Sequence, residues 1–269
     1  MPRTLLSTLL ALPLLALVLW PIERFWPARP GQRRLRADLP TDLTYWFMTP
    51  VVTRAVAHAA VVVAVVMLAV AAGAPLEGDA IRTFAAHGRG GLVQRQPVWL
   101  QALEVVVLGD LVGYWTHRLF HGRALWRIHA VHHSSEQLDW LSSVRLHPLN
   151  DVVTRLAQSM PLFVLGFDAK ILAAYVPFLS FYAILLHANV RWDFGPVRYV
   201  LASPRFHQWH HTRETEGLDT NFAGFFPFWD ALFGTLYLPR DREPQAFGLA
   251  NETVPDGVLG QLAYPFRRR

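Results

Sequence analysis

Long runs of apolar residues alternate with arginine-rich and proline-rich polar stretches along this 269-residue chain. Residues 5–22 and 45–73 form the first two runs, and the second is densest at 55–73. A third run covers residues 98–116. A helix needs about 20 apolar residues to cross the hydrocarbon core of a bilayer. The pattern therefore predicts membrane-spanning helices, within which we expect His58 to be a packed, neutral histidine.

Residues 152–187 form a fourth apolar stretch, which is too long for one ordinary span. Pro161, Pro177 and the segment 166–168 interrupt it. Two shorter helices that turn at Asp168 fit this stretch better, because an aspartate at the start of the second helix would cap its free amide groups. Such a hairpin leaves one membrane surface and returns to the same surface.

The composition also indicates a membrane protein, since 52% of the residues are hydrophobic and only 17% are charged, against about a quarter charged in soluble domains. A signal peptide is the competing interpretation of the first run, with Arg3 as its basic end. We expect a retained helix, because the run is longer than a usual signal core and no small-x-small cleavage site follows. The chain has no cysteine, which excludes disulfides, thiolate-held clusters and cysteine catalysis.

The charge distribution predicts an orientation. The net charge of +5 comes almost wholly from arginines that flank apolar runs, which suits anionic lipid headgroups better than nucleic acid. Five arginines lie in 23–42, and cytoplasmic loops are enriched in basic residues. With this loop inside the cell, the third run ends on the cytoplasmic side and the 152–187 hairpin returns there. We therefore predict an all-α, integral-membrane helical bundle with four or five apolar segments and a cytoplasmic histidine-rich cap.

Eight of the twelve histidines fall in three compact sets: His117 and His121 as HxxxH, His129, His132 and His133 as HxxHH, and His207, His210 and His211 as a second HxxHH. Residues three and four apart share one face of a helix, and imidazole is the commonest metal ligand. Eight ligands are too many for one ion, since zinc is usually held by four groups. Two ions with open positions fit better, and imidazole suits iron and zinc alike.

The order HxxxH, a short gap, HxxHH, a longer gap and a second HxxHH resembles the fatty acid hydroxylase/sterol desaturase superfamily of integral-membrane di-iron oxygenases. The seven-residue gap between His121 and His129 resembles this superfamily rather than the membrane acyl-CoA desaturases, whose first two boxes lie further apart. The resemblance is strong over about 98–240 and loose over the first ninety residues. Segments that resemble the bacterial branch are 129–140, 145–148, 185–196, 203–211 and 221–239.

The resemblance implies a set of catalytic metal ligands: His117, His121, His129, His132, His133, His207, His210 and His211. His187 fits a further family position, where some members carry an HxxxH pair. This chain has only Asn189 after it, so His147 is a candidate for the missing ligand. The implied cofactor is a pair of iron ions with O2 as co-substrate, and zinc could replace iron in purified protein.

Several acids near the sets could orient ligand rings in the way that carboxylates orient metal-bound histidines: Asp110, Glu136, Asp139 and Asp219. Asp110 lies seven residues before His117, on the same helix face, and could act directly or through another group. A plain hydrogen bond between helices is the alternative. The aromatic residues within 188–240 are expected to form core, a lid over the metals or contacts in the headgroup layer.

The resemblance implies a membrane oxidoreductase that uses O2 to hydroxylate, or to desaturate, a lipid C–H bond in lipid or sterol-type biosynthesis. It would lie in the bacterial inner membrane with its metal site on the cytoplasmic side. We expect N-terminal anchor helices over 1–97, the catalytic domain over 98–240 and a cytoplasmic tail over 241–269. The chain has no GxGxxG, haem or flavin motif, so a separate reductase, cytochrome or ferredoxin would supply electrons.

Two other classes stay open. A membrane metal transporter or sensor would place its ligands near the middle of the membrane, whereas these sets lie at or beyond the ends of the predicted spans. A metal-dependent hydrolase would need a carboxylate base beside the ligands, and the HExxH motif is absent.

Overall fold

The computed structural model describes residues 2–87 and 91–267, and in this part of the chain the regular structure is helical, with one isolated β-bridge between Thr212 and Phe247. The α-helices are α1 (Pro2–Phe25), α2 (Leu39–Met48), α3 (Arg54–Ala71), α4 (Gly78–His87), α5 (Val98–Phe120), α6 (Trp126–His133), α7 (Pro148–Val164), α8 (Ala169–His187), α9 (Pro204–His210), α10 (Phe228–Leu232) and α11 (Val258–Ala263).

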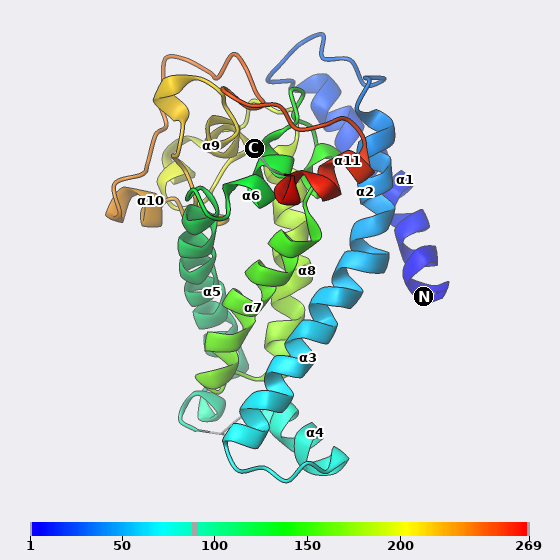
Figure 1. The fold of residues 1–269 in the computed structure, drawn as a ribbon. Coiled ribbons are helices and arrows are strands. Elements are labelled where there is room, and N and C mark those ends of the chain that lie inside the picture. Colours follow the sequence, from blue (N-terminus) through cyan, green and yellow to red (C-terminus); the bar gives the residue numbers. More distant parts are fainter. Residues whose placement is uncertain (1, 88–90, 268–269) are drawn as a thin grey trace.

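A shaft of long helices carries a cap of short helices at one end (Figure 1). In the shaft, α7 packs against α3 and α5, and α8 packs against α5. The cap contains α6, α9, α10 and α11, while α4 lies at the opposite end of the shaft. A short π-helical segment, Thr49–Thr53, joins α2 to α3, so that the two form one continuous helical rod.

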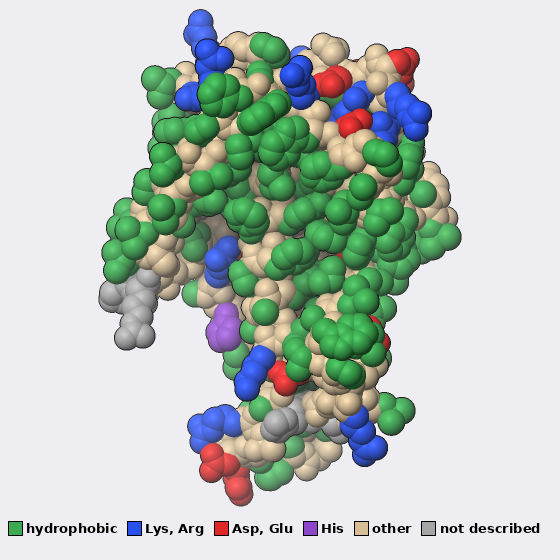
Figure 2. Space-filling view, turned by 180° about the vertical axis from the view of Figure 1, so that it is seen from behind, with side chains coloured by type: hydrophobic (Ala, Val, Ile, Leu, Met, Phe, Trp, Pro, Cys, Tyr) green, Lys and Arg blue, Asp and Glu red, His purple; other side chains and the backbone are tan. Residues whose placement is uncertain are grey.

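The outside of the shaft is apolar. Leu14 and Leu17 on α1 and Val63 and Met67 on α3 are all exposed. Seen from behind, hydrophobic side chains cover the middle of the molecule, and charged ones gather mostly at its two ends (Figure 2). A soluble monomer rarely exposes so continuous an apolar surface, which a bilayer would cover.

Within the described residues, four helical stretches are long and apolar enough to cross a membrane: Thr4–Phe25, Leu39–Ala71, Val98–Phe120 and Ala169–His187. With the shorter α7 they account for the predicted four or five apolar segments. The all-α bundle with a histidine-rich cap is therefore confirmed.

The predicted hairpin is present as α7 and α8. The Asp168 carboxylate accepts a hydrogen bond from the Lys170 amide at 2.7 Å and so caps α8. Close packing then holds α8 on α5. A methyl group added at Gly109 would lie 2.5 Å from the Tyr175 hydroxyl, so glycine at this position makes room for the Tyr175 side chain of α8 against α5. The hairpin returns the chain to the cap, where α8 ends at His187.

His58 differs from its prediction. It is exposed on α3, as is Arg54 one turn earlier. The reason is the place of α3 at the edge of the bundle, where α7 is its main helical neighbour and most of its side chains are not buried. The expectation of a packed side chain was wrong.

Candidate metal centre

Nine histidines gather in the cap in two groups, within each of which the candidate ligand atoms all lie within 4.8 Å of one another. The five-histidine group consists of His117, His121, His129, His133 and His210. The four-histidine group consists of His132, His187, His207 and His211. The two groups touch, because the rings of His133 and His211 stack with centroids 4.3 Å apart. Each group is large enough to hold one ion.

The chain reaches this centre from the ends of four helices. His117 and His121 lie in the last turn of α5 and at its C-cap, and His187 ends α8. The first HxxHH set is the C-terminal half of α6, and the second spans the end of α9 and its C-cap. The i,i+4 spacing places the rings side by side on one helix face, as predicted. The ring centroids of His117 and His121 are 5.4 Å apart, and those of His207 and His211 are 4.7 Å apart.

Six of the nine rings are oriented by a hydrogen bond from Nδ1 to an acceptor outside the centre. Four of these acceptors are backbone carbonyls and two are side-chain oxygens. The pairs are His117 with Phe222 O, His132 with Arg145 O, His187 with Ala183 O, His210 with Thr220 O, His129 with Asn150 Oδ1 and His121 with Asp219 Oδ1, at 2.7–3.1 Å. A carbonyl can only accept, so Nδ1 carries the proton and Nε2 is left as a bare lone pair.

These lone pairs point at one another. Nε2 of His117 lies 3.0 Å from Nε2 of His129, and Nε2 of His132 lies 3.2 Å from Nε2 of His187. Two acceptors at this distance repel unless a cation lies between them. Nε2 of His121 and of His210 are buried without a partner among the described residues. The donor set therefore fits metal ions and fits poorly with an ordinary polar core.

Burial keeps the rings of the two HxxHH sets neutral, as metal binding requires. Burial, with smaller contributions from neighbouring imidazoles, lowers the pKa of His129, His132 and His133 well below its usual value. The same causes lower the pKa of His210 and His211 in the second HxxHH set. At neutral pH these side chains offer lone pairs rather than positive charges.

His147 belongs to neither group. It is the N-cap of α7, where its Nδ1 accepts a hydrogen bond from the Leu149 amide at 3.2 Å, and its Nε2 lies 3.2 Å from the Leu262 carbonyl oxygen. Both ring nitrogens are therefore engaged outside the centre. Pro148 begins α7 and directs the His147 side chain to the helix terminus, so we leave His147 out of the proposed ligand set.

Two buried acids act on the centre through a loop. Asp110 on α5 accepts hydrogen bonds from the amides of residues 224–226 at 2.8–3.1 Å. Asp230 accepts from the amides of Phe222 and Ala223 at 2.7 and 2.9 Å, and burial raises its pKa to about 6. The loop so held presents the Phe222 carbonyl to His117. Of the two routes expected for Asp110, the structure has the one through another group.

Of the other three acids expected to orient ligand rings, one contacts a ring in the structure. Asp219 bonds directly to Nδ1 of His121, and this contact lowers the pKa of Asp219. Asp139 does not touch a ligand ring, but belongs to a buried ion network. Glu136 bonds to no ligand ring among the described residues and packs under Gly248.

The ion network lies behind His132. Arg145, whose carbonyl accepts from His132, bonds through its guanidinium to Asp42 at 2.6–2.7 Å. Arg36 bonds to Asp42 and Asp139 in turn. The side chains of Arg36, Arg145 and Asp42 are at most 4% exposed. The segment 23–42, expected only to be a cytoplasmic loop, thus supports a ligand from behind.

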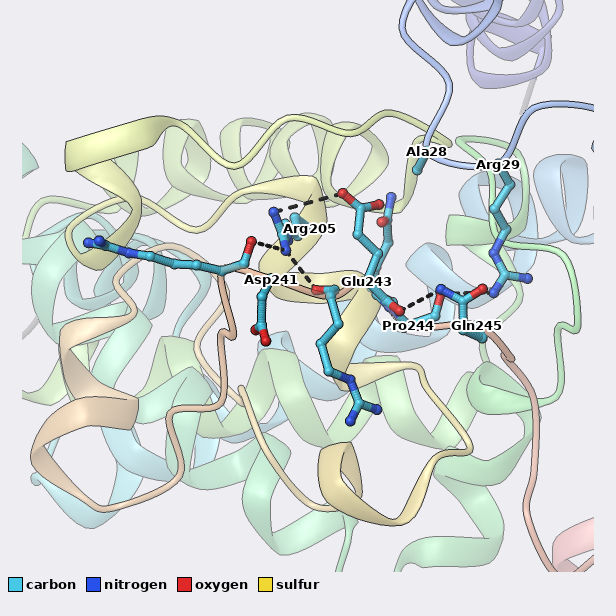
Figure 3. A pocket seen from close by; sticks show the side chains of 10 residues that line it. Ala28, Arg29, Arg205, Asp241, Glu243, Pro244 and Gln245 are labelled. Carbon is cyan, nitrogen blue, oxygen red and sulfur yellow. Dashed lines mark hydrogen bonds and ion pairs between the residues drawn. The ribbon is translucent and has the colours of Figure 1, made fainter.

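Helix α9 is fixed by two side chains on the face away from the histidines. Gln208 donates to the carbonyls of Ala188 and Val190 at 3.3 and 3.0 Å. Arg205 donates to the carbonyls of residues 239, 240 and 242 at 2.7–3.3 Å and points toward Glu243 across a cavity of about 520 Å³ (Figure 3). These bonds hold the ligands of α9 in register with His187.

Sequence reasoning missed several residues of this centre. Asn150, Arg145 and Asp42 carry no motif of their own, and the carbonyls of Phe222 and Thr220 belong to residues whose side chains do not matter for the bond. Asn150 was the residue that the sequence could have indicated. It lies at the end of the polar segment after the first HxxHH set, directly before an apolar helix.

The central part of the chain is similar in sequence to known proteins. Residues 102–235 match the family model described as Fatty acid hydroxylase. An ornithine lipid hydroxylase from Rhizobium tropici is 32% identical over 175 residues, which cover 64% of this chain and 53% of the relative. The human alkylglycerol monooxygenase is 30% identical over 144 residues, covering 53% of this chain and 31% of the relative.

A very-long-chain aldehyde decarbonylase from Oryza sativa subsp. indica is 28% identical over 185 residues, 62% of this chain and 29% of the relative. This chain thus spans between about a third and a half of the length of these relatives. None of the solved structures is a significant match. The chain carries a domain of the fatty acid hydroxylase family, and the matched residues contain all nine histidines of the centre.

Proposed function

We propose that this protein is a membrane-bound di-iron oxidoreductase that uses O2 to hydroxylate a lipid C–H bond, with desaturation as the related outcome. One observation carries the proposal. Nine imidazoles converge as two adjoining groups at the end of a bundle of membrane-spanning helices. The names of the relatives add support, because ornithine lipid, alkylglycerol and very-long-chain aldehyde are all lipids.

The five-histidine group would hold one iron ion and the four-histidine group the other. The pair would supply reductive activation of O2, which no side chain can provide. For hydroxylation the balance is one lipid C–H bond, one O2, two electrons and two protons, giving one C–OH bond and one water. A separate reductase, cytochrome or ferredoxin would deliver the two electrons.

The protein's own residues hold and shield this centre. The carbonyls of Phe222 and Arg145 orient His117 and His132, and the Phe120 ring stacks on His129 with centroids 5.5 Å apart. The Phe222 ring lies edge-on to His121 at 4.9 Å. These aromatic rings exclude water from one side of the imidazoles, where a methylene group would have to lie.

The proposal includes a location. The arginine-rich loop 23–42 and the cap lie at the same end of the shaft, so the positive-inside rule favours a cytoplasmic metal site in a bacterial inner membrane. The lipid would enter sideways from the bilayer. All nine candidate ligands lie at that end, which is unlike the mid-membrane sites of transporters.

The direct test is lipid mass spectrometry of a host with and without the gene, grown under 18O2. We expect one lipid class to gain a single labelled oxygen, and purified protein to contain about two iron ions per chain. A product that also forms under strict anaerobiosis would refute oxygenation and favour hydrolysis. Zinc in purified protein would not decide for hydrolysis, so activity is measured after loading with ferrous iron.

A further inference from the structure

A second cavity, of about 320 Å³, opens onto the five-histidine group from the polar end of the molecule. His121, His133 and His210 form part of its wall. The rest of the wall comes from Arg123 after α5, from Trp126 and Thr212, and from the segments 218–219 and 248–252. Its volume lies at the lower end of the range for small-molecule sites. The cavity is thus a polar approach to a centre whose other approach is the apolar shaft.

The cavity begins where α5 leaves the apolar part of the molecule. Leu119 in the last turn of α5 is 64% exposed, and Trp115 one turn earlier is also exposed. Arg123, four residues after Leu119, lines the cavity. A tryptophan near the end of a helix, with an arginine just beyond that end, is typical of a helix that crosses the bilayer surface. The mouth of the cavity therefore lies at the level of lipid headgroups.

The wall carries both signs of charge. Arg123 is exposed and makes no hydrogen bond or ion pair with the described residues. Asp219, 73% exposed at its side chain, uses Oδ1 for His121, and its Oδ2 has no hydrogen-bond partner among the described residues. Glu252 is held in place by Trp126 Nε1 and the Tyr264 hydroxyl. One guanidinium and two carboxylates thus line the same cavity beside the metal ligands.

We propose that this cavity binds the zwitterionic headgroup of the lipid substrate. Arg123 pairs with the headgroup's phosphate or carboxylate, and Asp219 and Glu252 pair with its ammonium group. Because three ligand rings form the wall, the headgroup lies against the centre, and the carbon that is oxidised lies in the headgroup or next to it. This inference rests on the proposed lipid oxidation and names the substrate class and the position of attack.

The larger cavity next to α9 also carries charges of both signs, Arg240 and Asp241 among them, but it does not adjoin the metal ligands. No ligand imidazole lines it. Its Arg205 is taken up by backbone carbonyls, and its Arg242 pairs with Glu214 at 2.7 Å. Figure 3 shows Arg205 directed at the 240–243 segment rather than into free space. The cavity at His121 therefore remains the better headgroup site.

The test measures binding first, with iron-loaded full-length protein kept anaerobic so that no turnover occurs. The probes are short-chain phosphatidylethanolamine and an acylated amino-acid lipid with a free amine, against neutral diacylglycerol and anionic phosphatidylglycerol. We expect both zwitterionic lipids to bind at least about tenfold more tightly than the other two. Arg123→Gln should weaken their binding about tenfold, as one lost charge-assisted hydrogen bond predicts, and Arg123→Lys should restore part of it.

The matched control is Arg33→Gln, which removes an exposed arginine from the 23–42 loop outside the cavity and should leave binding unchanged. With O2 and a reductant, Arg123→Gln should raise KM and leave kcat within about twofold. Tandem mass spectrometry should place the new oxygen in or beside the headgroup.

Equal binding of neutral and zwitterionic lipids, or equal effects of Arg123→Gln and Arg33→Gln, would overturn the headgroup site. An oxygen placed far along the acyl chain would overturn the position of attack while the proposed lipid oxidation stands. Selective binding that depends on Arg123, without oxidation of any lipid, would support the headgroup site and refute the oxidation.

Discussion

His121, in the five-histidine group, lines an open cavity and bonds to the exposed Asp219, whereas all four members of the other group are buried. The enclosed group is backed by the network around Arg145, which reaches it through the carbonyl that orients His132. Histidine is thus the candidate ligand in two different environments, one open to a cavity and one buried. The difference suggests that the ion of the five-histidine group is accessible to substrate and solvent, whereas the ion of the four-histidine group is enclosed and exchanges slowly.

The largest expected effect comes from the enclosed group. His132→Ala should abolish turnover and lower the iron content from about two ions to about one, because the four-histidine group would keep only three imidazoles. Iron analysis and lipid mass spectrometry of isolated membranes measure both results. The matched control, His147→Ala, should keep both ions and cost about 1 kcal/mol of stability as a lost helix cap. Full activity in His132→Ala would remove the four-histidine group from the mechanism.

The next effect is on pH dependence in the metal-free protein. Burial lowers the pKa of three rings in each group: His129, His133 and His210, and His132, His207 and His211. The unfolded chain therefore binds more protons than the folded chain below pH about 6.5. Stability should be flat above this pH and fall below it, by at most ~1.4 kcal/mol per pH unit for each ring.

Chemical unfolding of the metal-free protein in detergent between pH 5 and 8 measures this slope. His129→Gln and His132→Gln, one from each group, should each reduce it by about one proton. A slope that only one of the two variants changes would show that the groups differ in protonation as well as in access.

A third prediction concerns the support behind the enclosed group. Asp42→Ala leaves Arg36 and Arg145 buried without their shared partner, and should cost about 3–5 kcal/mol of unfolding free energy. Denaturant unfolding in detergent measures the loss. The control is Asp79→Ala, which breaks the exposed pair with Arg82 and should cost less than about 1 kcal/mol. Similar losses in the two variants would mean that the network does not support the fold.

The smallest effect is expected at the open group. Asp219→Asn weakens the acceptor that orients His121, and should lower the affinity of one ion about 10–100-fold. Competition with a chelator should then show one weakened ion and one unchanged. Loss of both ions together would contradict the independence of the two groups.

Much of this centre could be predicted from the sequence, because helical spacing is local. The three histidine sets needed only the i,i+3 and i,i+4 geometry of a helix, and Asp168 predicted the turn of the hairpin. The topology argument that brought His187 to the other sets also holds in the structure, since the hairpin ends in the cap.

What could not be predicted depends on contacts between distant segments. Asn150 faces His129, and the Phe222 carbonyl faces His117, only because α7 and the 222–226 loop pack where they do. His147 has the right chemistry for a ligand, but the proline after it begins a helix and uses its ring as a cap. The arginines of the 23–42 loop predicted on which side of the membrane this loop lies. They did not predict that tertiary packing buries Arg36.

The network of Arg36, Asp42, Asp139 and Arg145 also has a consequence for synthesis of the chain. Arg36 and Asp42 leave the ribosome about a hundred residues before the partners that complete their pairing. Until Asp139 and Arg145 are synthesised, Arg36 and Asp42 have only each other as charged partners within this network. Arg36 and Asp42 therefore form the first half of a network that the later-made Asp139 and Arg145 complete, and deleting the segment that holds them should weaken metal binding.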